Sequence, residues 1–358
     1  MSEYVSFDLV EWHAPLEKRI QPLQQPTGKQ VLVRVTAAGL CHSDLHAHKG
    51  VMDLGQEGTL SFADRGAKLP LTLGHEVAGT VESVGPDVTS VKVGQQVLVF
   101  PWIGCGKCQA CAEDRESDCM SMRIVGLVQK GGFASHCLVE DEKWLVDIDG
   151  LDATDVVPHA CSGVTVLNAL KKMGPLREGE WMAIMGCGGL GMNAIAIARA
   201  LGIINIIAVD IDDAKLDAAR KMGAAAVLNS GHPQAIEELQ RLAEGRLMGV
   251  IDTFGGAATS HIAVRSLLKA GRYIVVGQAG GDFQMPTIWL TQKAMTVRGS
   301  HVGNSPQLRT LIEMVRAGKV EQMPIELRKL SEINEAMEDL EAGRVTGRIV
   351  FQPDESKG

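Results

Sequence analysis

Strand-like and helix-like stretches alternate through the second half of this 358-residue chain, and this alternation restricts its fold more than any other feature. Apolar runs typical of buried strands at residues 181–186 and 204–210 enclose a helical pattern at 189–202, and three more helix–strand pairs follow up to residue 278. Strands that alternate with helices of about 10 to 15 residues are typical of βαβ units in a parallel sheet. The sequence therefore predicts a doubly wound α/β domain in this half.

A glycine-rich turn joins the first of these strands to its helix and fits the pattern GxGxxG. Its residues are Gly186, Cys187, Gly188, Gly189, Leu190 and Gly191. Gly186 permits the tight turn, Gly188 lets a pyrophosphate approach the backbone, and Gly191 lets helix and strand pack closely. A plain structural turn is the alternative, but the strand before it and the helix after it favour a Rossmann-type dinucleotide site.

Asp210 ends the next strand, nineteen residues beyond Gly191. A carboxylate at this place accepts hydrogen bonds from the adenosine ribose and repels a 2'-phosphate. Ile211 follows it and offers no cation to such a phosphate, so the sequence predicts NAD rather than NADP. A cap on the following helix is the alternative role for Asp210.

The first 150 residues show a different pattern of apolar and turn-forming residues. Short apolar runs at 31–39, 79–85, 95–100 and 135–140 are separated by glycine, proline and aspartate, which predicts an antiparallel, barrel-like domain. After about residue 303 two helical patterns and one strand, GRIVFQ, remain. We expect this tail to return and complete the first domain.

Charge and hydropathy exclude several classes of protein. The net charge of -8 argues against nucleic-acid binding, which requires a basic face. No cationic start with an apolar run marks a signal peptide, and no stretch approaches 18 apolar residues, so we expect no membrane span and a cytoplasmic location. In a reducing compartment, clustered cysteines are more often metal ligands than disulfides.

Four of the eight cysteines fall within fifteen residues, in CGKCQACAEDRESDC. They are Cys105, Cys108, Cys111 and Cys119. A ferredoxin-type iron–sulfur run would place the fourth cysteine three residues after the third, with a proline behind it, whereas here seven residues intervene and Met120 follows. Four thiolates favour a tetrahedral structural zinc whose coordination is complete.

Several of these motifs together resemble one family. GLCHSDLH, LGHEVAGTVESVG, the cysteine run, CSGVTVLNAL, GCGGLG and VDIDDAKL follow in the order found in zinc-dependent medium-chain alcohol dehydrogenases. The resemblance covers nearly the whole chain, and it is strongest to the bacterial and yeast-type branch because only eleven residues separate Cys119 from Gly131. It implies a GroES-like catalytic domain at 1–162, completed by 304–358, and an NAD-binding Rossmann domain at 163–303.

The resemblance also implies a catalytic zinc held by Cys41, His75 and Cys161, with the fourth position open for water or substrate. Considered alone, each of these residues is equally consistent with an ordinary buried cysteine or histidine. Glu76 matches an alternate ligand, and Asp44 matches the acid that orients the ligand histidine. With the structural site, two zinc ions per chain are expected.

The implied reaction is reversible hydride transfer from a zinc-bound primary or secondary alcohol to NAD, giving an aldehyde or ketone. Ser43 and His46 match the hydroxyl and the distal base of a proton relay. The remaining cofactor contacts that the family suggests are His42, Thr165, Lys215 and Arg348. A homotetramer is implied, with a dimer as the alternative.

Two other functions fit parts of the sequence. A zinc-free reductase of the same superfamily would lack the three ligands, and a non-catalytic NAD-binding protein would lack the relay. The 33 residues between Cys41 and His75 form a longer loop than in the yeast-type branch, expected either at the mouth of the cleft or as a solvated insertion. Trp102 is expected in the pocket or the core, and Cys187 is expected to be sensitive to alkylation.

Overall fold

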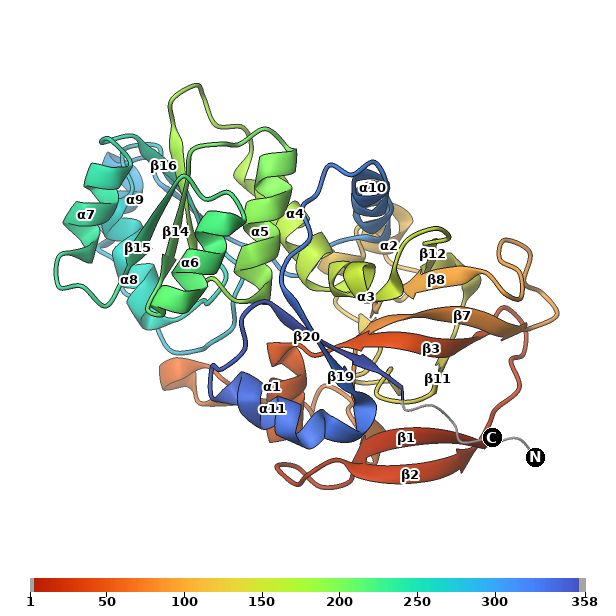
Figure 1. Ribbon diagram of the computed structural model, residues 1–358. Helices are drawn as coiled ribbons and strands as arrows, with labels where there is room; N and C mark the ends of the chain where they lie inside the picture. The colour runs from red at the N-terminus through yellow and green to blue at the C-terminus, as the bar shows by residue number, and fades with distance from the viewer. Residues whose placement is uncertain (1–2, 354–358) are drawn as a thin grey trace.

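The computed structural model describes residues 3–353 and shows two bodies, each built around a β-sheet, lying side by side (Figure 1). Residues up to about 160 and those after about 304 form one body, and the chain between them forms the other. No helix in the described range has the length and apolar character needed to cross a membrane.

The second body contains a six-stranded sheet in which every pairing is parallel. Its spatial order is β15-β14-β13-β16-β17-β18. Its strands are β13 (Trp181–Met185), β14 (Ile206–Asp210), β15 (Ala226–Asn229), β16 (Leu247–Asp252), β17 (Arg272–Val275) and β18 (Thr296–Gly299). The order reverses between β13 and β16, and ligands of such sheets bind at the carboxyl ends of the strands at that point. The predicted doubly wound sheet is confirmed.

Helices cover both faces of this sheet because successive strand residues point to opposite sides. Ile184 and Ala208 belong to one buried cluster, whereas their neighbours Ala183 and Ile207 belong to another. The helices are α4 (Ser162–Met173), α5 (Gly189–Ala200), α6 (Asp213–Lys221), α7 (Ala235–Leu242), α8 (Ala257–Ser266) and α9 (Thr287–Gln292). Both faces of the sheet are therefore buried from solvent, as the apolar strand runs predicted.

The first body is centred on a seven-stranded sheet of order β12-β8-β7-β3-β20-β19, with β11 also paired to β3. Its strands are β3 (Val31–Gly39), β7 (Glu76–Val84), β8 (Gln96–Val99), β11 (His136–Val139), β12 (Leu145–Asp147), β19 (Ile325–Lys329) and β20 (Arg348–Gln352). Among the described strands of this sheet, β19 and β20 are the one pair that runs in parallel. Because Val350 pairs with Gly39, the end of the chain joins the sheet formed by its beginning.

Smaller strand groups surround this sheet. They are β1 (Glu3–Leu9) with β2 (Glu17–Pro22) and β6 (Leu71–Thr72), β4 (Val51–Asp53) with β5 (Thr59–Ser61), and β9 (Trp102–Ile103) with β10 (Arg123–Ile124). The helices of this body are α1 (His42–Lys49), α2 (Gln109–Ala112), α3 (Ala153–Val156), α10 (Ser305–Arg316) and α11 (Ile333–Glu341).

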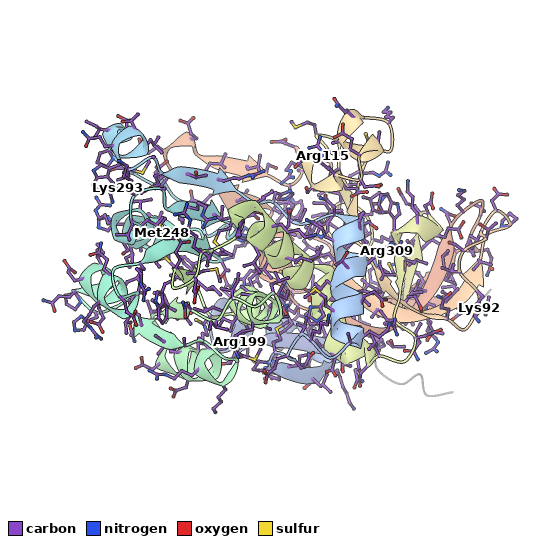
Figure 2. The ribbon with its side chains drawn as sticks, turned by 90° about the horizontal axis from the view of Figure 1, so that it is seen from above. Lys92, Arg115, Arg199, Met248, Lys293 and Arg309 are labelled. Carbon is purple, nitrogen blue, oxygen red and sulfur yellow. The ribbon has the colours of Figure 1, made fainter. Side chains whose placement is uncertain are left out.

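Helix α10 lies between the two sheets and contacts both bodies (Figure 2). Arg309, on the side of α10 that faces β12, donates hydrogen bonds to the carbonyls of Lys143 and Leu145, at 2.9 and 3.0 Å. Leu311 and Leu308, both fully buried, belong to the cores of the second and first body respectively. The two bodies are therefore joined by packing as well as by the chain.

Candidate metal and cofactor site

Three residues far apart in the sequence meet beside the start of two helices. β3 pairs with β7 so that Gly39 lies opposite Glu76, which brings Cys41 close to His75. Cys41 is the N-cap of α1 and Cys161 is the N-cap of α4, and their sulfur atoms lie 3.9 Å apart. A helix N-terminus favours negative charge, but the hydrogen bond with Cys41 and burial raise the pKa of Cys161, so Cys41 is the thiolate of the pair.

Asp44 orients this group from a position with no solvent exposure. Its Oδ1 accepts hydrogen bonds from His75 Nδ1 at 3.1 Å and from the Gly74 amide at 3.2 Å, and its Oδ2 accepts from the Cys41 amide at 2.9 Å. His75 Nε2 is buried and has no partner within residues 3–353. The histidine therefore presents one free nitrogen toward the two sulfur atoms.

The electrostatics of the ligands follow from these contacts. A hydrogen bond from Cys161 lowers the pKa of Cys41 well below its usual range, against the opposing effect of burial. Burial lowers the pKa of His75, but the charge of Asp44 and its hydrogen bond raise that pKa by more. The site thus favours one thiolate at its centre before any metal binds.

Glu76 and Arg348 form a buried pair behind these ligands. A guanidinium nitrogen of Arg348 lies 3.0 Å from Glu76 Oε1, although the two atoms are not aligned as a hydrogen bond. A Cβ at Gly39 would lie 1.9 Å from the Glu76 carboxylate, so this position has no room for a side chain. Burial raises the pKa of Glu76 to about 8, against the charge of Arg348.

The chemistry of this donor set fits zinc. One ligand atom each from Cys41, His75, Glu76 and Cys161 lies within 4.8 Å of the others. With Zn–S bonds of about 2.3 Å, tetrahedral geometry places two sulfur ligands about 3.8 Å apart, close to the observed 3.9 Å. Two cysteines and one histidine are a ligand set of catalytic zinc sites.

The second cysteine cluster occupies a separate lobe, which Arg115 marks in Figure 2. Cys108 and Cys111 have sulfur atoms 3.5 Å apart, Cys105 and Cys111 4.0 Å apart, and Cys119 completes a set within 4.8 Å. A hydrogen bond from the Lys107 backbone amide is the main interaction that lowers the pKa of Cys105, to about 6. Four cysteine ligands at these separations fit a tetrahedral structural zinc.

The glycine turn opens α5 at the carboxyl end of β13. Gly186 has φ of 89°, which favours glycine, and a Cβ at Gly191 would lie 1.9 Å from the Gly186 carbonyl. A Cβ at Gly188 would meet no protein atom within 4 Å, so the space beside it is open. The turn therefore has the geometry that a pyrophosphate group requires.

The other predicted cofactor residues come from several elements. Asp210 Oδ2 accepts a hydrogen bond from the Cys187 amide at 2.6 Å, which links the β14 carboxylate to the turn. Thr165 is buried and its hydroxyl has no partner within the described chain. The Arg348 guanidinium packs against Gly189, where an added Cβ would lie 3.0 Å from its central carbon. Lys215 Nζ lies near Gly343, 3.9 Å from the position of an added Cβ. Leu190 is half-buried, and His42 is exposed on the first turn of α1.

One sequence prediction is wrong. The sequence predicts that Cys187 is sensitive to alkylation, but this residue has no exposed surface and its thiol donates toward the Val209 carbonyl at 3.8 Å. Burial raises the pKa of this thiol, with a further contribution from the charge of Asp210. A buried thiol that stays protonated is a poor nucleophile.

Other residues at the cleft were missed or left open by the sequence. Trp102 is buried, donates to the Ala160 carbonyl at 3.2 Å and places its ring 5.5 Å from that of His75. The loop between Cys41 and His75 carries the β4–β5 hairpin to the mouth of the cleft, where the Gln56 amide donates to Asp282 at 2.9 Å. His301 lies 6.2 Å from Trp102. Its isolated place in GSHVG carried no sequence signal.

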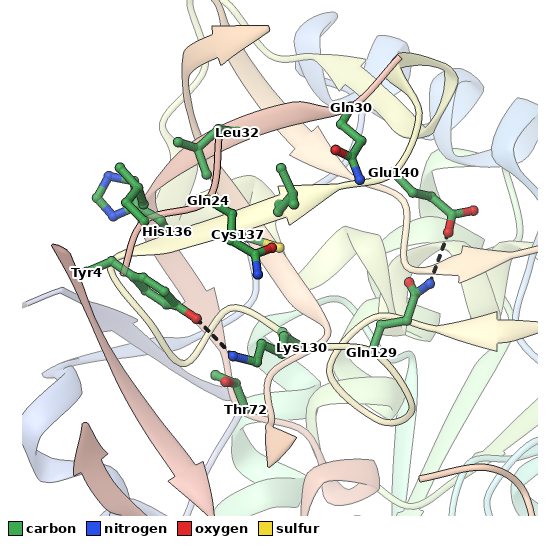
Figure 3. A pocket seen from close by; sticks show the side chains of 13 residues that line it. Tyr4, Gln24, Gln30, Leu32, Thr72, Gln129, Lys130, His136, Cys137 and Glu140 are labelled. Carbon is green, nitrogen blue, oxygen red and sulfur yellow. Dashed lines mark hydrogen bonds between the residues drawn. The ribbon is translucent and has the colours of Figure 1, made fainter. Parts of the chain in front are cut away.

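A separate hollow of about 290 Å³ lies between β1, β3 and β11 (Figure 3). Lys130 Nζ donates to the Tyr4 hydroxyl at 3.3 Å, and Gln129 donates to Glu140 at 3.0 Å. No residue predicted for the metal or cofactor site lines it. This hollow is therefore separate from the metal and cofactor residues.

A barrel-like domain joined to a dinucleotide-binding domain, with a buried Cys–His–Cys set between them, defines a zinc-dependent dehydrogenase. Residues 27–150 match the model of the alcohol dehydrogenase GroES-like domain, and residues 189–317 match that of the zinc-binding dehydrogenases. An NAD-dependent alcohol dehydrogenase of Sulfurisphaera tokodaii is 37% identical over 96% of this chain and 99% of its own. An alcohol dehydrogenase of Geobacillus stearothermophilus is 34% identical over 91% of this chain and 92% of its own.

Among solved structures, an alcohol dehydrogenase of the hyperthermophilic archaeon Aeropyrum pernix superposes with a TM-score of 0.88. It is 32% identical and covers 98% of this chain and 100% of its own. The chain belongs to the zinc-dependent medium-chain alcohol dehydrogenase family, as its motifs predicted. It is an NAD-dependent oxidoreductase of that family.

Proposed function

We propose that the protein reversibly oxidises primary or secondary alcohols to aldehydes or ketones by hydride transfer to NAD, with one catalytic and one structural zinc per chain. The observation that carries this proposal is the unpartnered, buried Nε2 of His75 facing two cysteine sulfur atoms. Cys41, His75 and Cys161 would hold the catalytic zinc. Zinc bound there would act as a Lewis acid that lowers the pKa of an alcohol hydroxyl.

The residues around this site keep the ligands in place and balance charge. Asp44 fixes the ring of His75 and the backbone before Cys41 at once. Glu76, paired with Arg348, lies close enough to serve as an alternate ligand. Since burying an unpaired carboxylate is costly, Arg348 stabilises Glu76 in this role.

Ser43 and His46 would carry the alcohol proton away. They stand three positions apart on α1 and therefore share one face of the helix. Ser43 Oγ lies 3.8 Å from Cys41 Sγ, and both Ser43 and His46 are half-buried. Burial lowers the pKa of His46, partly offset by the charge of Cys41, so its ring is neutral near pH 7 and can accept a proton.

NAD would lie across the carboxyl ends of β13 and β16. Its pyrophosphate would bind the turn from Gly186 to Gly191, and its adenosine ribose would bind Asp210. Thr165 supplies an unpartnered hydroxyl at the nicotinamide end. His42, Lys215 and Arg348 would add positive or polar groups along the phosphates.

Cys41→Ala tests the mechanism, with Cys137→Ala as a control. Cys137 is an equally buried cysteine on β11, remote from the ligands. We expect the Cys41 variant to lose NADH production and one zinc while its circular dichroism stays unchanged, and the Cys137 variant to keep both. Turnover near wild type in Cys41→Ala would contradict the mechanism, and one zinc with no NADH production in the wild type would favour a binding protein.

For assembly we propose a homotetramer, with a dimer as the smaller alternative. β18 is an edge strand of its sheet, paired with β17 alone among the described residues. Large apolar side chains nearby are exposed, namely Phe283 at 40%, Ile288 at 55% and Leu290 at 41%. Such edges and patches are usually covered by a partner. Light scattering of the purified protein measures the assembly.

We also propose a cytoplasmic location. All eight cysteines are free thiols in the structure, and the six that we assign to metal sites must remain reduced or metal-bound to function. Such chemistry suits a reducing compartment. Fractionation of the producing cell tests this assignment.

A further inference from the structure

A hollow of about 520 Å³ opens at the cleft between the β4–β5 segment and the second body. One wall comes from the long loop between Cys41 and His75, and the other from the backbone around Gly255, Gly277 and Gly280. The loop contributes Met52, Asp53, Leu54, Leu60 and Arg65, and His301 closes the side toward Trp102. The hollow is therefore apolar along much of one wall, with a few charged groups at its rim.

Arg65 stands on a turn that holds itself in place. Its amide donates to the Phe62 carbonyl at 3.1 Å, and the Ala67 amide donates to the same carbonyl at 3.0 Å. Phe62 and Ala67 are buried, so the turn is anchored on both sides of Arg65. Within residues 3–353, the Arg65 guanidinium has no ion-pair partner. The hollow is thus lined by an unpaired cation on a fixed turn.

His301 lies between Arg65 and the metal ligands. Ring contacts of 6.2 Å from His301 to Trp102 and 5.5 Å from Trp102 to His75 connect the two ends. Partial desolvation in the cleft lowers the pKa of His301, which keeps an exposed surface, and the charge of Arg65 lowers it further, so the imidazole is neutral near pH 7. A neutral histidine beside Arg65 adds a polar contact without a second charge.

The backbone that carries His301 is held in a strained conformation. Val302 has φ of 37°, which is rare for a β-branched residue, and Asn168 Nδ2 donates to its carbonyl at 2.7 Å. Gln307 donates to Asn168 Oδ1 at 3.0 Å and so fixes the Asn168 side chain that bonds this segment. This arrangement fixes the place of His301 at the wall of the hollow.

Asp53 is the acidic group that the same loop contributes to the hollow. Asp53 approaches Gly280, where a Cβ would come within 2.6 Å of its side chain, and its Oδ1 accepts from the Gly55 amide at 2.8 Å. Asp53 is therefore engaged with its own hairpin next to Gly280, whereas the charge of Arg65 acts on His301.

We propose that Arg65, with His301 beside it, is a specificity-determining residue that selects alcohols bearing a carboxylate remote from the hydroxyl. The planar guanidinium matches a carboxylate with two parallel hydrogen bonds, which a neutral alcohol cannot make. The reaction converts the hydroxy acid and NAD⁺ into the oxo acid, NADH and a proton. The two ring contacts between His75 and His301 place several carbons between the two groups. This inference rests on the proposed function.

The test compares each ω-hydroxycarboxylic acid with the 1-alkanol of equal carbon number, over a series of lengths, in the intact enzyme with NAD. Arg65→Ala should lower kcat/KM for the best hydroxy acid by about tenfold, through KM, and leave the alkanol unchanged. Arg65→Glu should lower it further. Lys68→Ala, an exposed cation of the same segment that does not line the hollow, is the matched control and should change neither substrate.

Each result discriminates. An unchanged ratio of hydroxy acid to alkanol in Arg65→Ala would overturn the inference, as would a wild-type preference for the alkanol at every length. A fall of equal size in Lys68→Ala would also overturn it, because it would report general surface charge. Failure of the wild type to oxidise any alcohol would instead overturn the proposed function.

Discussion

Asp44→Asn is the most informative change near the metal ligands because Asp44 holds two of them. Its Oδ1 accepts from His75 and Gly74, and its Oδ2 accepts from the Cys41 amide. An asparagine keeps one oxygen and replaces the other by an amide donor. In either orientation at least one buried N–H then faces another donor.

The size of the effect follows from this count. Leaving one buried donor unpaired costs about 1–3 kcal/mol, and one factor of ten corresponds to about 1.4 kcal/mol. We therefore expect Asp44→Asn to weaken the catalytic zinc by about 10- to 100-fold, the range found for such supporting partners of metal ligands. Activity should fall in parallel and recover in part when zinc is added.

Competition with a chromogenic chelator measures zinc affinity, and NADH formation measures activity. Asp8→Asn is the matched control because Asp8 is equally buried, at 1% exposure, and accepts from Thr72 and Gln21 at 2.7 and 2.8 Å, away from the ligands. It should lower the melting temperature without changing zinc affinity. Zinc affinity within about threefold of wild type in Asp44→Asn would refute the reasoning.

Three further predictions concern the lobe, the cofactor and acid stability. Cys111→Ser should remove one of the two zinc ions and make the lobe sensitive to protease, as mass spectrometry and limited proteolysis would show; retention of both ions would contradict the assignment of a structural zinc to the four cysteines. Asp210→Gly combined with Ile211→Arg should raise KM for NAD by about tenfold and admit NADP, and unchanged coenzyme kinetics would contradict the ribose assignment. Hydrogen bonds from Ser90 and Thr89 lower the pKa of Glu142 to about 2. Its stabilisation is therefore complete above the unfolded pKa of about 4.3 and is lost as the pH falls toward 2. Glu142→Gln should be less stable at pH 7 and lose less stability between pH 5 and 2 in denaturant titrations, and parallel pH curves would contradict this.

Local patterns in the sequence determined much of the fold. Hydrophobic periodicity and the glycines and prolines that end each element depend only on neighbouring residues. The doubly wound sheet and the glycine turn could therefore be predicted from the sequence alone. The cysteine lobe could be predicted for the same reason, since its four ligands fall within fifteen residues. The role of Asp44 followed from the family resemblance.

Tertiary structure alone decided how distant segments meet. Cys41 and Cys161 are 120 positions apart, and their contact depends on which strands pair and where two helices begin. The burial of Arg348 between Glu76 and the glycine turn depends on the last strand returning to β3. No periodicity encodes such pairings, because they are selected by the packing of whole sheets. The same holds for Arg65 and His301, which line one hollow only because the long loop reaches the second body.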